Sequence, residues 1–141
     1  MSAFTYKRSI AINTSAQKVW SVIVDPLAIP KYYFGIHWET DWKKGSAIAF
    51  TGEWDHQPFR DKGFILDIEA EKFLHFNYFN ADSGKADVPE NYTVIRYELT
   101  GVGNICLFTV YEYGFKSEAE FSTVETKWNF LAVTLKELAE S

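Results

Sequence analysis

The stretch YTVIRYELTGVGNICLFTVYEYGFKSEAEFSTVETKWNFLAVTLKEL, residues 92–138, decides the fold of this chain. Apolar and polar residues alternate on both sides of the sequence TGVGN, which predicts two antiparallel strands joined by a tight turn. After Ser117 the apolar residues recur every three or four positions, as they do along an amphipathic helix. Members of that stripe are Phe121, Val124, Trp128, Leu131, Leu135 and Leu138. A strand face and a helix stripe that are both apolar are buried by packing against each other.

Upstream of this stretch, the strand pattern extends back to residue 37 and is interrupted by turn-type sequences. These are DWKKG (41–45), DHQP (55–58), EAEK (69–72) and the polar segment 80–91. A further strand is predicted at 4–12, and two short helices are predicted between it and residue 37. We therefore predict an α+β fold with a curved antiparallel sheet of about seven strands. A long C-terminal helix at 117–140 is expected to pack on the concave face of that sheet.

Length, charge and composition narrow the class of protein. The 141 residues suffice for one domain with a sizeable core, so we expect a single domain over 1–141. The net charge of −5 argues against non-specific binding to nucleic acid or to an anionic membrane surface. Because no apolar run exceeds four residues, we expect no membrane insertion and a cytoplasmic location. Aromatic residues are unusually frequent, since 12 Phe, 8 Tyr and 5 Trp make up 18% of the chain.

Motifs for metal, cofactor or nucleotide chemistry are missing from the sequence. His37, His56 and His75 lie 19 residues apart on different predicted elements, without the close spacing of metal ligands. Cys106 is the only cysteine, so it cannot form an internal disulfide. We therefore predict no metal, no cofactor and no catalytic residue, with Glu112 as the single weak catalytic candidate.

Glu112 is unusual because it shares a strand face with apolar residues. Alternation along 105–113 places it in register with Cys106, Phe108 and Val110. A carboxylate on that face needs a partner, a proton or a wet cavity to offset its lost hydration. The alternative is that Glu112, two residues before Gly114, lies at the strand end and faces water.

The same alternation predicts a set of large side chains on the core side of the sheet, opposite the terminal helix. Such a set lines either a ligand pocket or a close-packed core, and both interpretations stay open. The candidate ligand-binding residues are Trp38, Phe50, Trp54, Phe64, Leu66, Phe76, Tyr78, Ile95, Tyr97, Phe108, Glu112, Trp128 and Leu131. Phe73, Phe79 and Ile65 are predicted on the opposite, convex face, where they would form an exposed apolar patch.

Five segments of the chain carry a family resemblance. They are INTSAQKVWSVIVDPLAIPKYY (12–33), DWKKG (41–45), GFILDIEAEKFLHFNY (63–78), YELTGVGNICLFTVYEYGF (97–115) and KWNFLAVTLKEL (127–138). In this order they resemble the activator of heat-shock protein 90 ATPase homologue family, within the START-like, birch-pollen-allergen-like (SRPBCC) superfamily, which implies a helix-grip fold. Departures from the family pattern are Ser46 for glycine, Ala70 for proline, Tyr78 for tryptophan, Glu112 for histidine and Lys127 for glycine.

The superfamily that the chain resembles includes hydrophobic-ligand carriers, co-chaperones and aromatase/cyclases, so three functions are implied. The first is non-catalytic binding of a small hydrophobic or aromatic ligand, lipid-like or polyketide-like, between the sheet and the terminal helix. The second is a protein-interaction domain with a chaperone or another protein as partner. The third is an aromatase/cyclase-type enzyme in which Glu112 is the general acid/base and Tyr97 or a tryptophan N–H polarises a carbonyl. A monomer or homodimer of the bacterial, single-domain type is expected, with no nucleic-acid partner.

Overall fold

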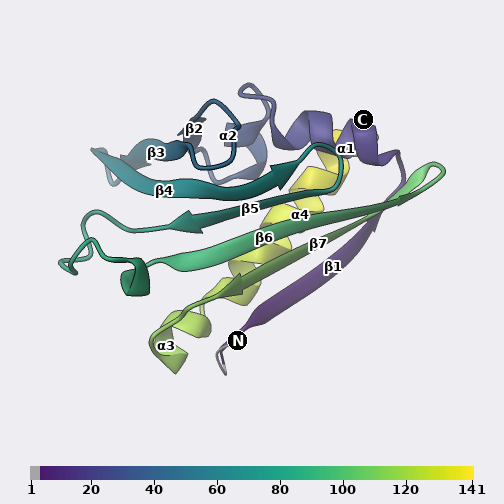
Figure 1. Cartoon of the computed structure of the whole chain (residues 1–141). Helices are drawn as coiled ribbons and strands as arrows, with labels where there is room; N and C mark the ends of the chain where they lie inside the picture. Colours follow the sequence, from purple (N-terminus) through teal and green to yellow (C-terminus); the bar gives the residue numbers. More distant parts are fainter. Residues whose placement is uncertain (1–3) are drawn as a thin grey trace.

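A computed structural model describes residues 4–141 and contains one antiparallel sheet of seven strands (Figure 1). In sheet order they are β1 (Tyr6–Ile12), β7 (Ile105–Tyr113), β6 (Thr93–Val102), β5 (Phe73–Tyr78), β4 (Gln57–Glu69), β3 (Ala47–Trp54) and β2 (His37–Glu39). Strands β2 to β7 follow one another as a meander, whereas β1 lies beside the last strand. In that pairing Tyr6 lies opposite Glu112 and Ile12 opposite Cys106. The α+β architecture predicted from the sequence is confirmed.

The helices are α1 (Ala16–Ile23), α2 (Ile29–Tyr32), the short 3-10 helix η1 (Pro89–Asn91), α3 (Glu118–Phe121) and α4 (Val124–Glu140). Helices α1, α2 and α4 pack together on one side of the sheet, whereas η1 lies in the β5–β6 connection (Figure 1). Figure 1 shows α4 running diagonally across one face of the sheet, so the arrangement is a helix grip. Between the two, the core consists of fully buried side chains from both layers, such as Phe76 and Tyr97 from the sheet and Trp128 from α4.

The helix predicted at 117–140 is divided into α3 and α4. Ser117 caps α3, because its Oγ accepts a hydrogen bond from the backbone N–H of Glu120 at 3.2 Å. The Ser122 hydroxyl then donates to the carbonyl of Ala119, and the Thr123 hydroxyl donates to the carbonyl of Glu120. Such side-chain bonds compete with the helical backbone pattern, which explains why the helix ends and restarts here.

Strand β4 corrects part of the predicted face assignment. Ile65 pairs with Phe76 but Asp67 pairs with His75, so Leu66 is an extra residue in a β-bulge. Ile65 is buried, whereas Phe64 and Leu66 are 36% and 41% exposed on the other face. The predicted face was therefore wrong for Phe64, Ile65 and Leu66. Before the bulge, the residues of β4 that point into the core are Asp61 and Gly63, and neither is apolar, so the sequence pattern did not reveal the inward face.

Two further predictions about exposure are wrong. Trp54 was expected in the core but is 81% exposed. It closes the β3–β4 hairpin, where Asp55 and His56 both have left-handed backbone angles and form a tight two-residue turn beyond the core. The expected convex patch of Phe73, Phe79 and Ile65 does not form either. Phe79 is buried and stacks on the ring of Tyr92, with 5.1 Å between ring centroids.

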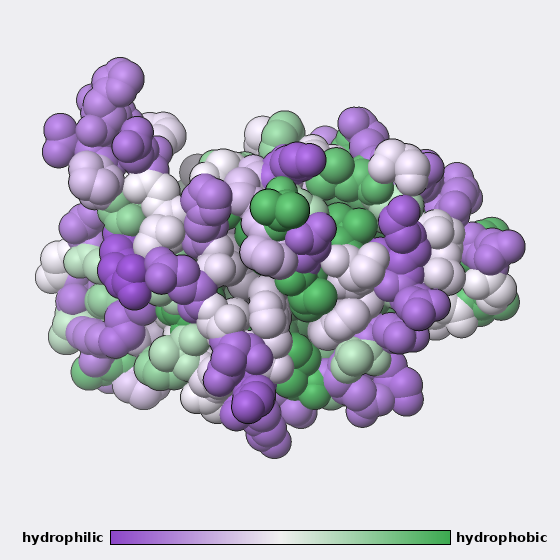
Figure 2. All heavy atoms as spheres, turned by 90° about the horizontal axis from the view of Figure 1, so that it is seen from above, coloured by the Kyte–Doolittle hydropathy of each residue, from purple (hydrophilic) through white to green (hydrophobic). Residues whose placement is uncertain are grey.

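Figure 2 views the molecule from above Figure 1 and shows one of its outer surfaces. Hydrophobic residues appear there in several separate clusters with hydrophilic residues between them. Small exposed apolar clusters are normal on a folded protein, because apolar atoms contribute much of any folded surface.

Candidate functional site

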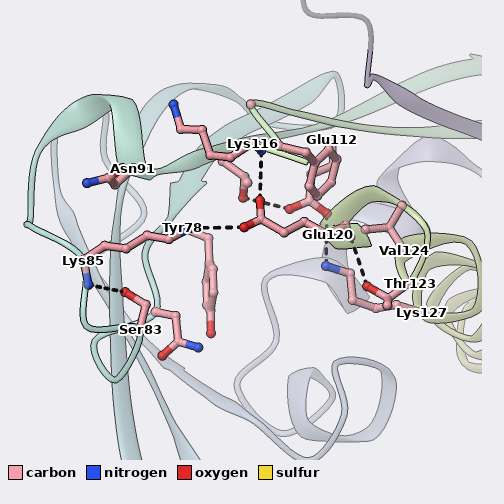
Figure 3. Close-up of a pocket in the computed structure, with 14 residues that line it drawn as sticks. Tyr78, Ser83, Lys85, Asn91, Glu112, Lys116, Glu120, Thr123, Val124 and Lys127 are labelled. Atoms are coloured by element: carbon pink, nitrogen blue, oxygen red, sulfur yellow. Dashed lines mark hydrogen bonds and ion pairs between the residues drawn. The ribbon is translucent and has the colours of Figure 1, made fainter. Parts of the chain in front are cut away.

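A hollow of about 350 Å³ lies where the sheet ends and α4 begins. Its walls come from the β5–β6 connection, the end of β7 with the residues that follow it, and α3 with the first turn of α4 (Figure 3). This volume falls within the usual range for small-molecule pockets. We call it the outer cavity.

Glu112 forms the floor of the outer cavity. It is only 3% exposed, so its predicted position on the core side is confirmed and the strand-end alternative is wrong. Its Oε1 accepts hydrogen bonds from Trp128 Nε1 at 2.9 Å and from Lys127 Nζ at 3.0 Å. Its Oε2 accepts a third hydrogen bond, from Thr93 Oγ1 at 2.8 Å. These donors from β6 and α4 offset the hydration that the carboxylate loses on burial.

Lys127 brings a cation to the same floor. The side chain is about one-third exposed, and its ammonium also lies 4.5 Å from the ring centroid of Trp128. An ammonium carries three donors, and Glu112 accepts from one of them. In Figure 3 Lys127 reaches from α4 toward Glu112 beside the cavity. The remaining donor capacity is therefore next to the space that a ligand would occupy.

The rim of the outer cavity is crossed by Glu120. Its Oε2 lies 3.1 Å from Lys85 Nζ on the β5–β6 connection, and its Oε1 accepts from the backbone N–H of Lys116 at 2.9 Å. The Lys116 N–H, with a smaller contribution from Lys85, lowers the pKa of Glu120. The ammonium of Lys116 itself forms no salt bridge within residues 4–141. The side chains of Lys85 and Lys127 thus each pair with one carboxylate of the site, and Lys116 contributes its backbone N–H.

Tyr78 forms one wall. Its hydroxyl donates a short hydrogen bond to Asp61 Oδ2, and Asp61 Oδ1 accepts from the backbone N–H of Ala81 at 3.0 Å. Burial, followed by the bond to Asp61, raises the pKa of Tyr78 far above its ordinary value. The phenol is therefore held neutral and fixed in orientation by a buried aspartate of β4.

A smaller cavity of about 130 Å³ lies on the far side of Tyr78 and Lys127, which border both spaces. Its other lining residues are Tyr33, Phe34, Ile36 and Ile95. We call it the inner cavity. Together the two cavities follow the junction between the concave face and the start of α4.

The predicted site residues divide into three groups. Tyr78, Ile95 and Glu112 border the cavities. A second group is buried in the packed core, namely Trp38, Phe50, Phe76, Tyr97, Phe108, Trp128 and Leu131. Trp54, Phe64 and Leu66 lie outside the interior, as described above.

Several residues of the site escaped prediction. Among them are Tyr33, Asp61 and Lys127, together with Thr93, Lys85 and Glu120. A signal existed for Lys127, because it is one of the positions where the chain departs from the family pattern it resembles. Tyr78 and Glu112 are two more of these positions, and all three line the outer cavity. Three of the five departures, which are far apart in the sequence, therefore meet in one place in the fold.

Within residues 4–141, no cluster of three or more His, Cys, Asp or Glu side chains is suited to hold a metal ion. None of the helices in that same part of the chain combines the length and apolar character needed to cross a membrane.

The chain matches one protein-family model and is similar to several solved structures. A family model described as activator of Hsp90 ATPase homolog 1-like protein matches residues 13–140. The solution structure of ChR145 from Cytophaga hutchinsonii is 34% identical, with a TM-score of 0.77 over 96% of this chain and 93% of that one. Protein MLL2253 from Mesorhizobium loti is 16% identical, with a TM-score of 0.78 over 95% of each chain.

A third similar structure is DynU16, a protein of the dynemicin biosynthetic locus. It is 13% identical, with a TM-score of 0.78, and the match covers 99% of this chain but 48% of DynU16. At this identity the likeness concerns the fold. A search of curated proteins found no match.

Proposed function

The chain belongs to the family of activator of Hsp90 ATPase homolog 1-like proteins, in the START-like helix-grip superfamily, and from this premise we propose that it is a ligand-binding protein. The ligand is a small aromatic molecule with an acidic end, and it occupies the outer cavity. It is bound without a chemical reaction.

The observation that carries this proposal is the pair of Glu112 and Lys127 at the floor of a cavity. A close-packed core does not need such a pair, because apolar residues of similar volume stabilise a fold at least as well. Here the pair lies between the sheet and the terminal helix, next to about 350 Å³ of space. An ionic pair that costs hydration and borders a cavity is typical of a binding site.

Hydrogen-bonding capacity around the cavity indicates which ligand group fits. Glu112 already accepts three hydrogen bonds, and Glu120 accepts from Lys85 and from the backbone of Lys116. The ammonium groups of Lys116 and Lys127 still have donors to offer. The site therefore has unused hydrogen-bond donors and lacks an acceptor for them. A carboxylate or an acidic hydroxyl of the ligand supplies that acceptor.

The walls favour a ring system for the rest of the ligand. The cavity is bordered by the rings of Tyr78 and Phe115 and by Val124. Flat aromatic molecules pack well against such rings. The similarity in fold to a protein of the dynemicin biosynthetic locus supports a ring-containing, polyketide-like ligand.

A matched pair of probes tests the proposal. Fluorene-2-carboxylate carries the acidic end and fluorene lacks it, so titration by tryptophan fluorescence separates the two contributions. The double variant Glu112→Gln, Lys127→Met removes both charges together and so leaves no unpaired buried charge. We expect it to bind fluorene-2-carboxylate roughly tenfold more weakly and to bind fluorene as before.

Lys44→Met is the control variant, because Lys44 is exposed in the 41–45 turn and does not line the cavity. It should bind both probes like the wild type. The proposal fails if the wild type binds neither probe, or if the double variant and Lys44→Met bind the acid equally well. Native mass spectrometry of the protein purified from its host adds the mass of any natural ligand.

The geometry gives less support to an aromatase/cyclase role for Glu112. A general acid/base must reach the reacting atom of the substrate, and three of the hydrogen-bonding positions of this carboxylate are already taken. In a cyclase assay on an accepted substrate, Glu112→Gln would abolish turnover if the residue were the acid/base.

A co-chaperone role is the second candidate function, favoured by the family and by the exposed side chains of Phe64 and Leu66 on the outer face of β4. In this case the host's heat-shock protein 90 would be retained by the immobilised wild type. The double variant Phe64→Ser, Leu66→Ser, whose cavity is unchanged, would no longer retain it.

A further inference from the structure

Tyr33 separates the inner cavity from the aromatic core. Its ring borders the cavity and is 96% buried overall, since only 4% of the residue is exposed. The same ring packs against Trp38, Phe50 and Trp128, with centroid distances of 5.2, 6.4 and 6.5 Å. One side chain therefore fills the place where the cavity would otherwise continue between the sheet and α4.

Two polar atoms behind Tyr33 have no hydrogen-bond partner within residues 4–141. They are the hydroxyl of Tyr97, a residue with no exposed surface, and the indole N–H of Trp38, which is 7% exposed. Burial raises the pKa of Tyr97 well above its ordinary value, and the neighbouring Tyr33 raises it further. Tyr97 thus stays a neutral donor. Buried donors are nearly always satisfied in folded proteins, so the unsatisfied hydroxyl of Tyr97 needs an explanation.

The backbone that follows Tyr33 forms a tight turn with one strained residue. Tyr33 is the residue at which α2 ends, and the next two residues, Phe34 and Gly35, both have left-handed backbone angles, with φ of 57° and 73°. A left-handed conformation is unfavourable for phenylalanine, so the local energy does not favour the present arrangement. The turn is held by hydrogen bonds from Gly35 N–H to Pro30 O and from Ile36 N–H to Tyr33 O.

We infer that Tyr33 is a gate, and that an aromatic ligand with a carbonyl group at the end opposite its acidic group displaces it. The ligand ring then packs among Trp38, Phe50 and Trp128 in place of the tyrosine ring, so aromatic contacts are exchanged and not lost. Its carbonyl oxygen accepts the hydrogen bond that Tyr97 has to offer. This inference rests on the proposed function and narrows the ligand to an aromatic keto acid.

The test compares 7-acetylfluorene-2-carboxylate, the oxo acid, with 7-ethylfluorene-2-carboxylate. The two acids differ only by the carbonyl oxygen, which lies at the end opposite the carboxylate. Tyr97→Phe removes only a hydroxyl. We expect it to weaken binding of the oxo acid about fivefold and to leave the other acid unchanged, in line with one neutral hydrogen bond. Tyr33→Ala removes the gate, and both acids should bind it more tightly than the wild type.

Hydrogen exchange in the wild type reports the movement itself. Saturation with the oxo acid should speed exchange at the amides of Gly35 and Ile36, because their hydrogen bonds belong to the turn that opens. A ligand confined to the outer cavity would leave these amides unchanged or slow their exchange. Thermal unfolding of each variant confirms that it is folded.

The outcomes separate the gate from the proposed function. Unchanged or slower exchange at both amides, or an equal effect of Tyr97→Phe on the two acids, overturns the gate. In that case, weaker binding of both acids to the variant without Lys127 still supports a ligand in the outer cavity. If neither acid binds to the wild type or to Tyr33→Ala, both ideas are wrong.

Discussion

The middle and the end of the concave face are built by the same strands but differ in what lies above them. In the middle, Tyr97 on β6 packs against Phe108 on β7 and against Trp128 on α4, and all three are fully buried. Four residues further along the same strands, the inward positions are Thr93 and Glu112, and a cavity lies over them. A shift of four residues along these strands thus separates a packed core from a polar site.

The largest expected loss of stability follows from a substitution in the packed region. Phe108→Ala should reduce the free energy of unfolding by about 3 to 5 kcal/mol, because it removes a buried ring and leaves a void. Leu107→Ala, on the next residue but on the outer face, is the control and should cost less than about 1 kcal/mol. Urea denaturation measures both. Equal losses would mean that the two faces of β7 are not packed differently.

The next effect concerns the polar end. Glu112→Ala should cost about 2 kcal/mol, since it leaves the buried indole N–H of Trp128 and the hydroxyl of Thr93 without an acceptor. Glu53→Ala, at an exposed position of β3, should be neutral within about 0.5 kcal/mol. A Glu112→Ala protein as stable as the wild type would show that this carboxylate has no structural role.

A gain in stability is expected in the middle of the face. Tyr97→Phe removes a buried hydroxyl without a partner, so the ligand-free protein should become more stable by up to about 1 kcal/mol. Tyr32→Phe is the contrasting variant, because the Tyr32 hydroxyl donates to the carbonyl of Ile23 at 2.6 Å and its loss should destabilise the protein. The midpoints of thermal unfolding rank the two variants against the wild type.

The smallest effect is the pH dependence of the rim. Because the pKa of Glu120 is lowered in the folded state, its contribution is fully present above the ordinary carboxyl value of 4.5 and is lost as the pH falls below it. The carboxylate is substantially exposed, so solvent screening limits the effect to about 0.5 kcal/mol. The difference in unfolding free energy between wild type and Glu120→Gln should shrink from pH 6 to pH 3.5. A difference that is independent of pH would contradict this.

Periodicity predicted the fold and one key site residue, but not the cavity. Glu112 was found because an acidic residue at an apolar position is visible in the sequence, and the helical stripe around Trp128 was visible for the same reason. Phe64 and Leu66 were misplaced because a β-bulge reverses parity without a sequence signal of its own. Tyr33 and Lys127 were missed because their roles depend on contacts between distant elements and on empty space, which no local pattern encodes.

Strand β1 can pair only with a strand that is synthesised much later. Its partner is β7, and the hydrogen bond between the hydroxyls of Ser9 and Thr109 joins residues 100 positions apart. At usual rates of translation about 5 to 20 s pass between the synthesis of these two residues. During that time β1 is an unpaired strand with one apolar face, and the sheet can be completed only after β7 has left the ribosome. Assembly of this protein is therefore expected to be late and slow, with the first strand among the last to be secured.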